Sequence, residues 1–217
     1  ANSGKALYHL MVAPDGSMRA AVQGETWLAG TMLRTGAQST AQLEFDDGSQ
    51  ALVRQLTQVR LLQAQRPVLG DGNQVQLEMV RGAVDNLVRP AKGPGGRFEI
   101  RTPAAIAAVR GTQFRVSATE RQTRAEVIDG EVLVRNDAGQ STTAAGTGTL
   151  VDLGASPALP RPLLAAPDLS ALPGRLERLP IDWPVTAVAG GAAYRTQLAA
   201  SSRFDALLSD EVTTPPR

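Results

Sequence analysis

Hydrophobic and polar residues alternate most regularly between residues 98 and 134. Phe98 and Ile100, for example, alternate with Glu99 and Arg101. Seven apolar residues share this alternation: Phe98, Ile100, Phe114, Val116, Val127, Val132 and Val134. A period of two is what a half-buried strand requires. The segment therefore predicts four short strands whose apolar sides form one buried cluster.

The chain before this segment also reads as strands and turns. Strands are expected at 7–12, 18–22, 41–45, 51–54, 57–62, 75–79 and 83–88. The turn composition of Pro14-Asp15-Gly16-Ser17 predicts a hairpin between the first two, and Asp46-Asp47-Gly48-Ser49 predicts another turn. Residues 67–73 and 89–96 are expected to be loops.

Glycines fall at the expected strand ends, at positions 48, 82, 111, 130 and 148. The last three lie 19 and 18 residues apart, close to one two-strand coil of a stacked β-roll or solenoid. An irregular two-sheet sandwich is an equally consistent interpretation. In either case Gly111 is predicted to have a positive φ or to lie too close to a neighbouring strand for a side chain.

The composition changes after residue 155. Five prolines between Pro157 and Gly174 predict an extended linker over 156–174, because proline cannot donate to a strand ladder. Its leucines, Leu159, Leu163 and Leu164, are expected to lie along the preceding domain.

The tail, residues 175–217, predicts three strands and a capped helical turn at 201–208. The first strand contains Leu176, Leu179 and Ile181 and leads to Trp183-Pro184, the second is 185–188 and the third is 192–198. Its apolar residues include a candidate interface made of Trp183, Tyr194, Phe204 and Leu207. Three strands cannot close two sheets, so these side chains would leave an apolar face bare. We expect the chain to be a fragment of a longer protein, or the tail to pack on the preceding domain or on a second chain.

Composition excludes several classes of protein. The 22 basic and 21 acidic residues of the 217 nearly cancel, and basic residues do not cluster, so nucleic acid is not an expected partner. Cysteine is absent, which excludes disulfides and thiolate metal sites. The longest small-apolar run, 104–109, is far too short to span a membrane. Aromatic residues are only 4%, so the core must be built from Val, Leu and Ala.

Candidate catalytic and ligand-binding groups are weak. His9 is the single histidine and lies in an apolar strand, without a Gly-x-Ser-x-Gly motif elsewhere. Glu44 and Asp46 share one side of a strand and could bind calcium weakly, but a solvated strand face is the stronger interpretation. The Gly146–Thr149 segment lacks the third glycine of a dinucleotide loop. No catalytic residue, cofactor or metal site is predicted.

One ordered set of motifs resembles the FecR-domain family. It comprises Thr102-Pro103, then Arg110-Gly111-Thr112-Gln113-Phe114-Arg115-Val116, Asp129-Gly130-Glu131-Val132-Leu133-Val134 and Ala145-Gly146, with Gly30 to Ser39 upstream. The signature residues are Thr102, Pro103, Arg110, Gly111, Thr112, Phe114 and Gly130. Arg110 could be a structural ion-pair partner or a binding residue. The tail resembles part of a fibronectin type III-like sandwich, a layout found in envelope-type members, often behind a peptidoglycan-binding LysM domain.

The resemblance implies an all-β protein with a hairpin at 1–26, a FecR-like domain at 27–155, the linker at 156–174 and the fibronectin-like segment at 175–217. It implies a periplasmic or otherwise extracytoplasmic, non-enzymatic module that binds a protein or positions adjacent domains, with a signal-related role. Peptidoglycan would be reached through a neighbouring domain. The alternative is a glycan- or peptidoglycan-binding module, for which Trp27 would have to be exposed beside polar groups. A strand added at a sheet edge is the expected mode of partner binding.

Overall fold

The computed structural model describes residues 9–37, 39–65, 74–90, 96–170, 172, 174–175, 185–200 and 207–214. Within these ranges the regular elements are strands, which confirms the all-β class. They are β1 (His9–Val12), β2 (Met18–Ala20), β3 (Met32–Thr35), β4 (Ala41–Glu44), β5 (Gln50–Val53), β6 (Gln58–Gln65), β7 (Gln74–Leu87), β8 (Arg97–Arg101), β9 (Ile106–Val109), β10 (Gln113–Ala118), β11 (Gln122–Asp129), β12 (Glu131–Asn136), β13 (Gly139–Ala144), β14 (Thr147–Asp152), β15 (Arg161–Pro162), β16 (Tyr194–Ala199) and β17 (Leu207–Thr213). The chain divides into two compact units, residues 1–162 and 163–217.

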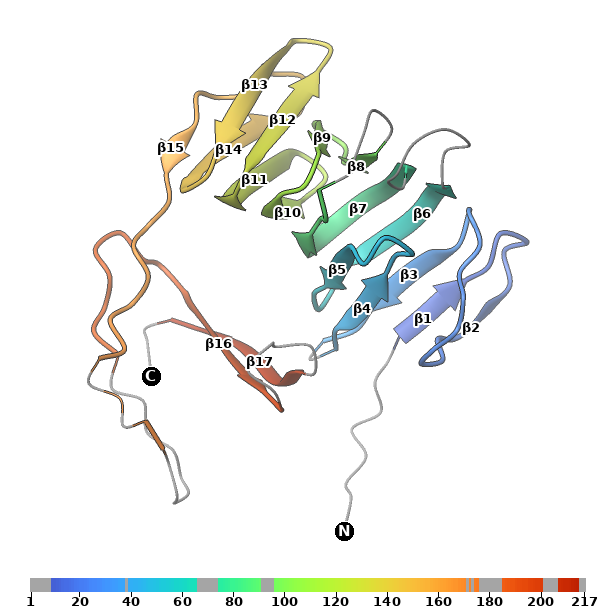
Figure 1. Cartoon of the computed structure of the whole chain (residues 1–217), viewed down its shortest axis with the longest axis horizontal. Helices are drawn as coiled ribbons and strands as arrows, with labels where there is room; N and C mark the ends of the chain where they lie inside the picture. Colours follow the sequence, from blue (N-terminus) through green and yellow to red (C-terminus); the bar gives the residue numbers. More distant parts are fainter. Residues whose placement is uncertain are drawn as a thin grey trace. The chain divides into compact units, whose positions relative to one another are not determined.

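The first unit consists of two sheets that share β7. The first sheet has the order β2-β1-β3-β6-β7-β8-β9-β12-β13, and the second has the order β4-β5-β7-β10-β11-β14-β15. All pairs are antiparallel except β7 and β8, which are parallel. Along this unit the colours pass in sequence order from the blue β1–β3 to the yellow and orange β12–β15 (Figure 1).

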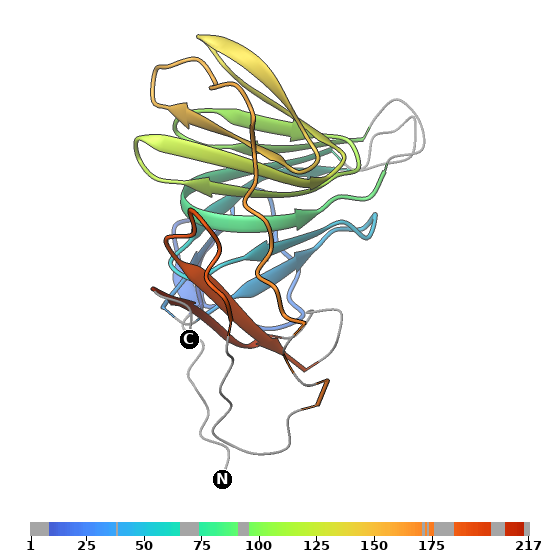
Figure 2. The ribbon, with the colours of Figure 1, turned by 90° about the vertical axis from the view of Figure 1, so that its left-hand side faces the viewer.

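The chain builds this unit by adding two strands to one sheet and then crossing to the other. β8 and β9 join the first sheet, β10 and β11 the second, β12 and β13 the first, and β14 and β15 the second. Figure 2 shows these strands stacked along the unit. The stacked two-sheet arrangement that the glycine spacing suggests is therefore confirmed.

The core lies between the two sheets. The seven residues of the predicted cluster are all buried, none more than 2% exposed, and belong to one apolar core. Phe98 is in edge-to-face contact with Phe45 and Phe114, with ring centroids 5.6 and 6.3 Å apart. Valine, leucine and alanine side chains make up most of the rest of the core, as the low aromatic content requires.

Two predictions about the strands of the first unit are wrong. The segment 98–134 contains five strands, because Ile106–Val109 forms β9 in addition to the four expected. Gly82 and Gly148 lie inside β7 and β14 and do not end them. Residues 74–81 of β7 pair with β6 and β8, whereas 82–87 pair with β5 and β10, so Gly82 is where one continuous strand changes sheet.

The backbone at Gly82 explains why glycine is needed there. Its φ is +104°, and a Cβ atom would lie 2.2 Å from Thr57 Oγ1 and 2.4 Å from Thr57 Cα. Thr57 Oγ1 also accepts a hydrogen bond from Ala83 N at 2.9 Å. The crossing of β7 therefore depends on the absence of a side chain at Gly82.

The N-terminal hairpin is present as predicted. β1 and β2 pair antiparallel, and Asp15 Oδ1 accepts a hydrogen bond from Ser17 N at 2.9 Å in the turn. β1 also pairs with β3, so the hairpin continues the first sheet. The predicted loop at 67–73 and residues 91–95 of the predicted loop at 89–96 lie outside the described residues.

The proline-rich segment contributes β15, which pairs with β14. Ala158 N donates to Leu150 O at 2.9 Å, but Leu159 is 85% exposed and Leu164 is also exposed. The prediction that the linker leucines lie along the preceding domain is wrong for Leu159, because the backbone of this segment makes the contacts while that side chain points to solvent.

The second unit contains the antiparallel pair β16–β17. The predicted strand at 192–198 corresponds to β16, but residues 185–188 have no strand structure. Leu207 and Leu208 lie in β17 rather than in a helical turn, because pairing with β16 overrides the local capping pattern. The rest of the predicted turn, 201–206, and the first predicted strand of the tail lie outside the described residues.

Candidate functional site

Two of the signature motifs lie where the chain crosses between the sheets. Arg110-Gly111-Thr112 connects β9 to β10, and Asp129-Gly130 connects β11 to β12. Gly111 has a φ of +74°, and a Cβ atom there would lie 2.7 Å from Pro90 Cα, so the prediction for this glycine is confirmed. A Cβ atom on Gly130 would lie 3.1 Å from Gly111 O, so the two crossings pack directly against each other.

Two threonines of the signature make further hydrogen bonds, Thr102 in the connection between β8 and β9 and Thr112 in the crossing between β9 and β10. Thr102 Oγ1 donates to Ala105 O at 2.7 Å and lies 2.6 Å from Thr123 Oγ1. Thr112 Oγ1 donates to Glu131 O at 3.0 Å. Pro103 is exposed, and Phe114 is in the core. These contacts give the signature residues a structural role in joining the sheets.

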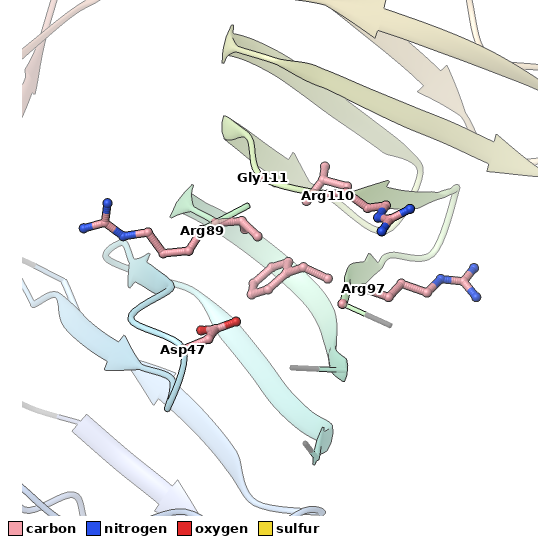
Figure 3. A pocket seen from close by; sticks show the side chains of 9 residues that line it. Asp47, Arg89, Arg97, Arg110 and Gly111 are labelled. Carbon is pink, nitrogen blue, oxygen red and sulfur yellow. The ribbon is translucent and has the colours of Figure 1, made fainter. Parts of the chain in front are cut away.

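A small hollow lies beside the Arg110–Gly111 turn, between the ends of β4, β7, β8 and β9 (Figure 3). Its apolar lining includes Val88, Phe98 and Val109. The cavity volume is about 10 Å³, roughly the room that one water molecule needs. It cannot hold a sugar ring or a nucleotide.

Charged side chains surround the hollow. Asp47 Oδ1 accepts a hydrogen bond from Ser49 N at 2.8 Å, so this carboxylate belongs to the turn. Arg97 and Arg110 extend to the same side, and Arg89 extends to the opposite side (Figure 3).

Glu99 is a buried carboxylate that the alternation pattern misses. It lies on the outer side of β8, as predicted, yet it is only 1% exposed. Its oxygens lie 2.5 Å from Arg97, 3.5 Å from Arg135 and 3.8 Å from Arg101, and Gln76 Nε2 donates to it at 3.2 Å. The arginines two residues before and after Glu99 are the signal in the sequence that could have indicated this cluster.

The remaining predicted sites are not brought together. The side chain of His9 lies outside the described part of the chain, and in the Gly146–Thr149 segment Gly146 ends a turn while the other three residues begin β14. No group of three His, Asp or Glu side chains that could hold a metal ion occurs among the residues described.

The candidate interface of the tail is only partly described. Trp183, Phe204 and the side chain of Leu207 lie outside the described residues. Tyr194 Oη accepts a hydrogen bond from Val188 N at 2.6 Å within the second unit. The interface stays a prediction.

The exposure of Trp27 is the test of the glycan-binding alternative. Its ring is partly buried and packs against the core, and its side chain hydrogen-bonds Glu25. A sugar-stacking platform needs an exposed ring, so Trp27 does not favour this alternative.

The fold and the crossing motifs define an all-β domain of two stacked sheets. Residues 31–133 match the model of the family described as FecR protein. In the part of the chain that the structure describes, no helix is long and apolar enough to cross a membrane.

Two crystal structures of a candidate anti-sigma factor from Parabacteroides distasonis ATCC 8503 are similar to this chain. Each is 20% identical to it, and each match covers 60% of this chain and 59% of that chain. The TM-scores are 0.50 and 0.49. The first match shows a shared fold. No curated protein matched the sequence.

Proposed function

We propose that this protein is a non-enzymatic protein-interaction module on the extracytoplasmic side of the bacterial envelope, with a role in signalling or in positioning neighbouring domains. The match of residues 31–133 to the FecR protein family supports this proposal. The fold shared with the candidate anti-sigma factor supports it further, because such a factor acts by binding another protein.

The observation that carries the proposal is the free edge of β13. Among the described residues, the strands at the sheet edges of the first unit are β2, β4, β13 and β15, with three, four, six and two residues. β13 is the longest, and its sequence, Gly-Gln-Ser-Thr-Thr-Ala, contains neither a charge nor a proline. Proteins usually protect edge strands with such residues, so an unprotected edge favours pairing with a partner strand.

The hairpin geometry indicates which groups a partner would meet. β12 and β13 are joined by the two-residue turn 137–138, with Asn136 opposite Gly139. The closing pair of such a hairpin is hydrogen-bonded, and bonded pairs alternate along the ladder. The N–H and C=O groups of Gln140 and Thr142 therefore face the free edge, where an extended segment would bind.

Substitution at Thr142 tests this mode of binding. Thr142→Pro removes both the outward backbone N–H and the threonine hydroxyl. Thr142→Val also removes the hydroxyl but keeps the N–H, so it is the matched control. Because the Thr142 side chain is exposed and on an edge strand, proline is tolerated there. Circular dichroism checks that both variants fold.

The measurement is affinity capture from a bacterial envelope extract, using the intact chain and both variants. We expect the parent and Thr142→Val to retain the same partner protein and Thr142→Pro to lose most of it. Equal retention by the folded proline variant would contradict strand addition at β13.

A further inference from the structure

Four arginines share the outer face of the first sheet. We call Arg97, Arg101, Arg110 and Arg135 the arginine face. In the strand register, Arg101 and Arg135 lie on either side of Ile106, and Glu99 is opposite Ala108. Arg97 and Arg110 extend to one side of the ribbon (Figure 3). The four side chains thus come from β8, from β12 and from the turn that follows β9, the strand between them.

Glu99 holds three of these arginines in place. Arg97, Arg101 and Arg135 converge on its carboxylate at 2.5, 3.8 and 3.5 Å. Their side chains remain 54%, 45% and 40% exposed. A guanidinium has five N–H donors, and one carboxylate has too few acceptor sites for three such groups, so donors remain available toward solvent. The buried glutamate orders the arginines without using up their hydrogen-bonding capacity.

The charge on this face is more positive than that of the whole chain. The carboxylates that accompany the arginine face are Glu99, Glu131 at the start of β12, and Glu78, which pairs with Arg60 at 3.5 Å. With Arg60 added to the four arginines of the face, five arginines are set against three glutamates. Their net charge is +2, compared with +1 for all 217 residues.

The chemistry and spacing of the face fit carboxylates. Arginine forks bind carboxylates bidentately. Arg97 and Arg101 are four residues apart on one strand, which is about 13 Å at the usual rise. An extended segment with acidic residues at alternate positions would reach both. Duplex nucleic acid is less well matched, because its binding typically uses about 6–10 phosphate contacts.

We propose that the arginine face binds an acidic segment of a partner protein. The inference rests on the proposed function as a protein-interaction module and specifies the chemistry of its partner. It also agrees with the position of β13, which belongs to the same sheet: a strand added there would extend the sheet whose outer face carries the arginines.

The test uses two labelled 12-residue peptides, one of alternating Glu and Ser and one of alternating Gln and Ser. Fluorescence anisotropy measures their binding to the intact chain, to the double variant Arg101→Gln/Arg135→Gln and to the control Arg124→Gln. Arg124 is an exposed arginine of β11 in the second sheet. Thermal melting confirms that each variant folds.

We expect the parent chain to bind the acidic peptide and to prefer it over the neutral one. The double variant should lose about tenfold or more in affinity, and Arg124→Gln should stay within about twofold of the parent. Added salt should weaken binding to the parent, because exposed charges are screened.

Three results would overturn the inference: equal affinity for the two peptides, an equal loss in Arg124→Gln, or tighter binding of an oligonucleotide or of anionic lipid vesicles than of the acidic peptide. If the acidic peptide fails to bind while envelope capture still depends on the β13 edge, the inference is wrong and the proposed function stands.

Discussion

The two units of the chain are stabilised by different interactions. Among the described residues, every buried apolar side chain belongs to the first unit, where two sheets cover one core. The described strands of the second unit form a single ladder, β16–β17, and a two-stranded hairpin is marginally stable at best. There the Arg195–Asp210 pair, with Nε donating to Oδ1 at 2.6 Å, and the Tyr194 contact to Val188 take on a larger share of the stability.

This difference shows where function can be carried without disturbing the fold. In the first unit the interior is filled and its hollow has room for about one water molecule. The features that suggest binding, the β13 edge and the arginine face, both lie on the exterior of a rigid scaffold. Binding residues placed on a rigid scaffold pay less ordering entropy than those on flexible segments.

The largest effect is expected from Gly111→Val in the first unit. A side chain at a φ of +74° and 2.7 Å from Pro90 Cα should cost about 1–3 kcal/mol through strain and overpacking. Pro90 is exposed and can shift, which limits the cost. Urea unfolding of the intact chain measures the change.

Gly146→Val is the matched control. Gly146 has a φ of +75° but nothing within 4 Å of a Cβ atom, so it shares the backbone strain and lacks the crowding. Gly111→Val should therefore destabilise the first unit more. If the two variants unfold at the same denaturant concentration, the close packing of the two crossings is incidental.

A smaller effect is expected from Asp210→Asn in the second unit. The Asp210 side chain is 7% exposed, and the Arg195 guanidinium donates a hydrogen bond to each of its carboxylate oxygens. Loss of the charge removes the carboxylate that faces the Arg195 guanidinium, whose side chain is only 20% exposed, at a cost of about 1–2 kcal/mol. Hydrogen exchange should quicken at the amides of β16 and β17.

Glu211→Gln serves as the control in the same strand, because Glu211 is exposed. Its exchange rates should match those of the parent. Unchanged exchange in Asp210→Asn would show that this ion pair contributes little and that the hairpin is held by other contacts.

The sequence predicts interactions along one strand better than interactions between strands. Phe98, Phe114 and Val132 follow a local alternation, so their burial could be predicted. The burial of Glu99 could not, because the covering side chains come from β7 and β12, far away in the chain. Gly82 was predicted to end a strand, because local reasoning cannot show that one strand serves two sheets.

The signature residues illustrate the same limit. Gly111 could be predicted from its position between two strands, but its partner Pro90 lies more than 20 residues earlier. The capping-box spacing in the tail favoured a helical turn, yet Leu208 lies in β17. Pairing with a distant strand outweighs a local preference in each case.

The smallest effect is a pH dependence at the loop between β2 and β3. Three groups lower the pKa of Glu25 below its usual 4.5: the Val22 backbone N–H, which donates to it at 2.9 Å, then Arg19 at 2.5 Å, and the Trp27 side chain. A carboxyl group with a lowered pKa stabilises the folded state above its unfolded pKa, and this contribution is lost as the pH falls through the folded value. The loop should therefore loosen below about pH 4.5. Because Arg19 is half exposed, we expect the Glu25 contacts to contribute less than about 1 kcal/mol to the stability of the folded state.

The fluorescence of Trp27, followed in a Trp183→Phe background, should change in this pH range in the parent and stay constant in Glu25→Gln. The same acid transition in both proteins would mean that another group controls the loop.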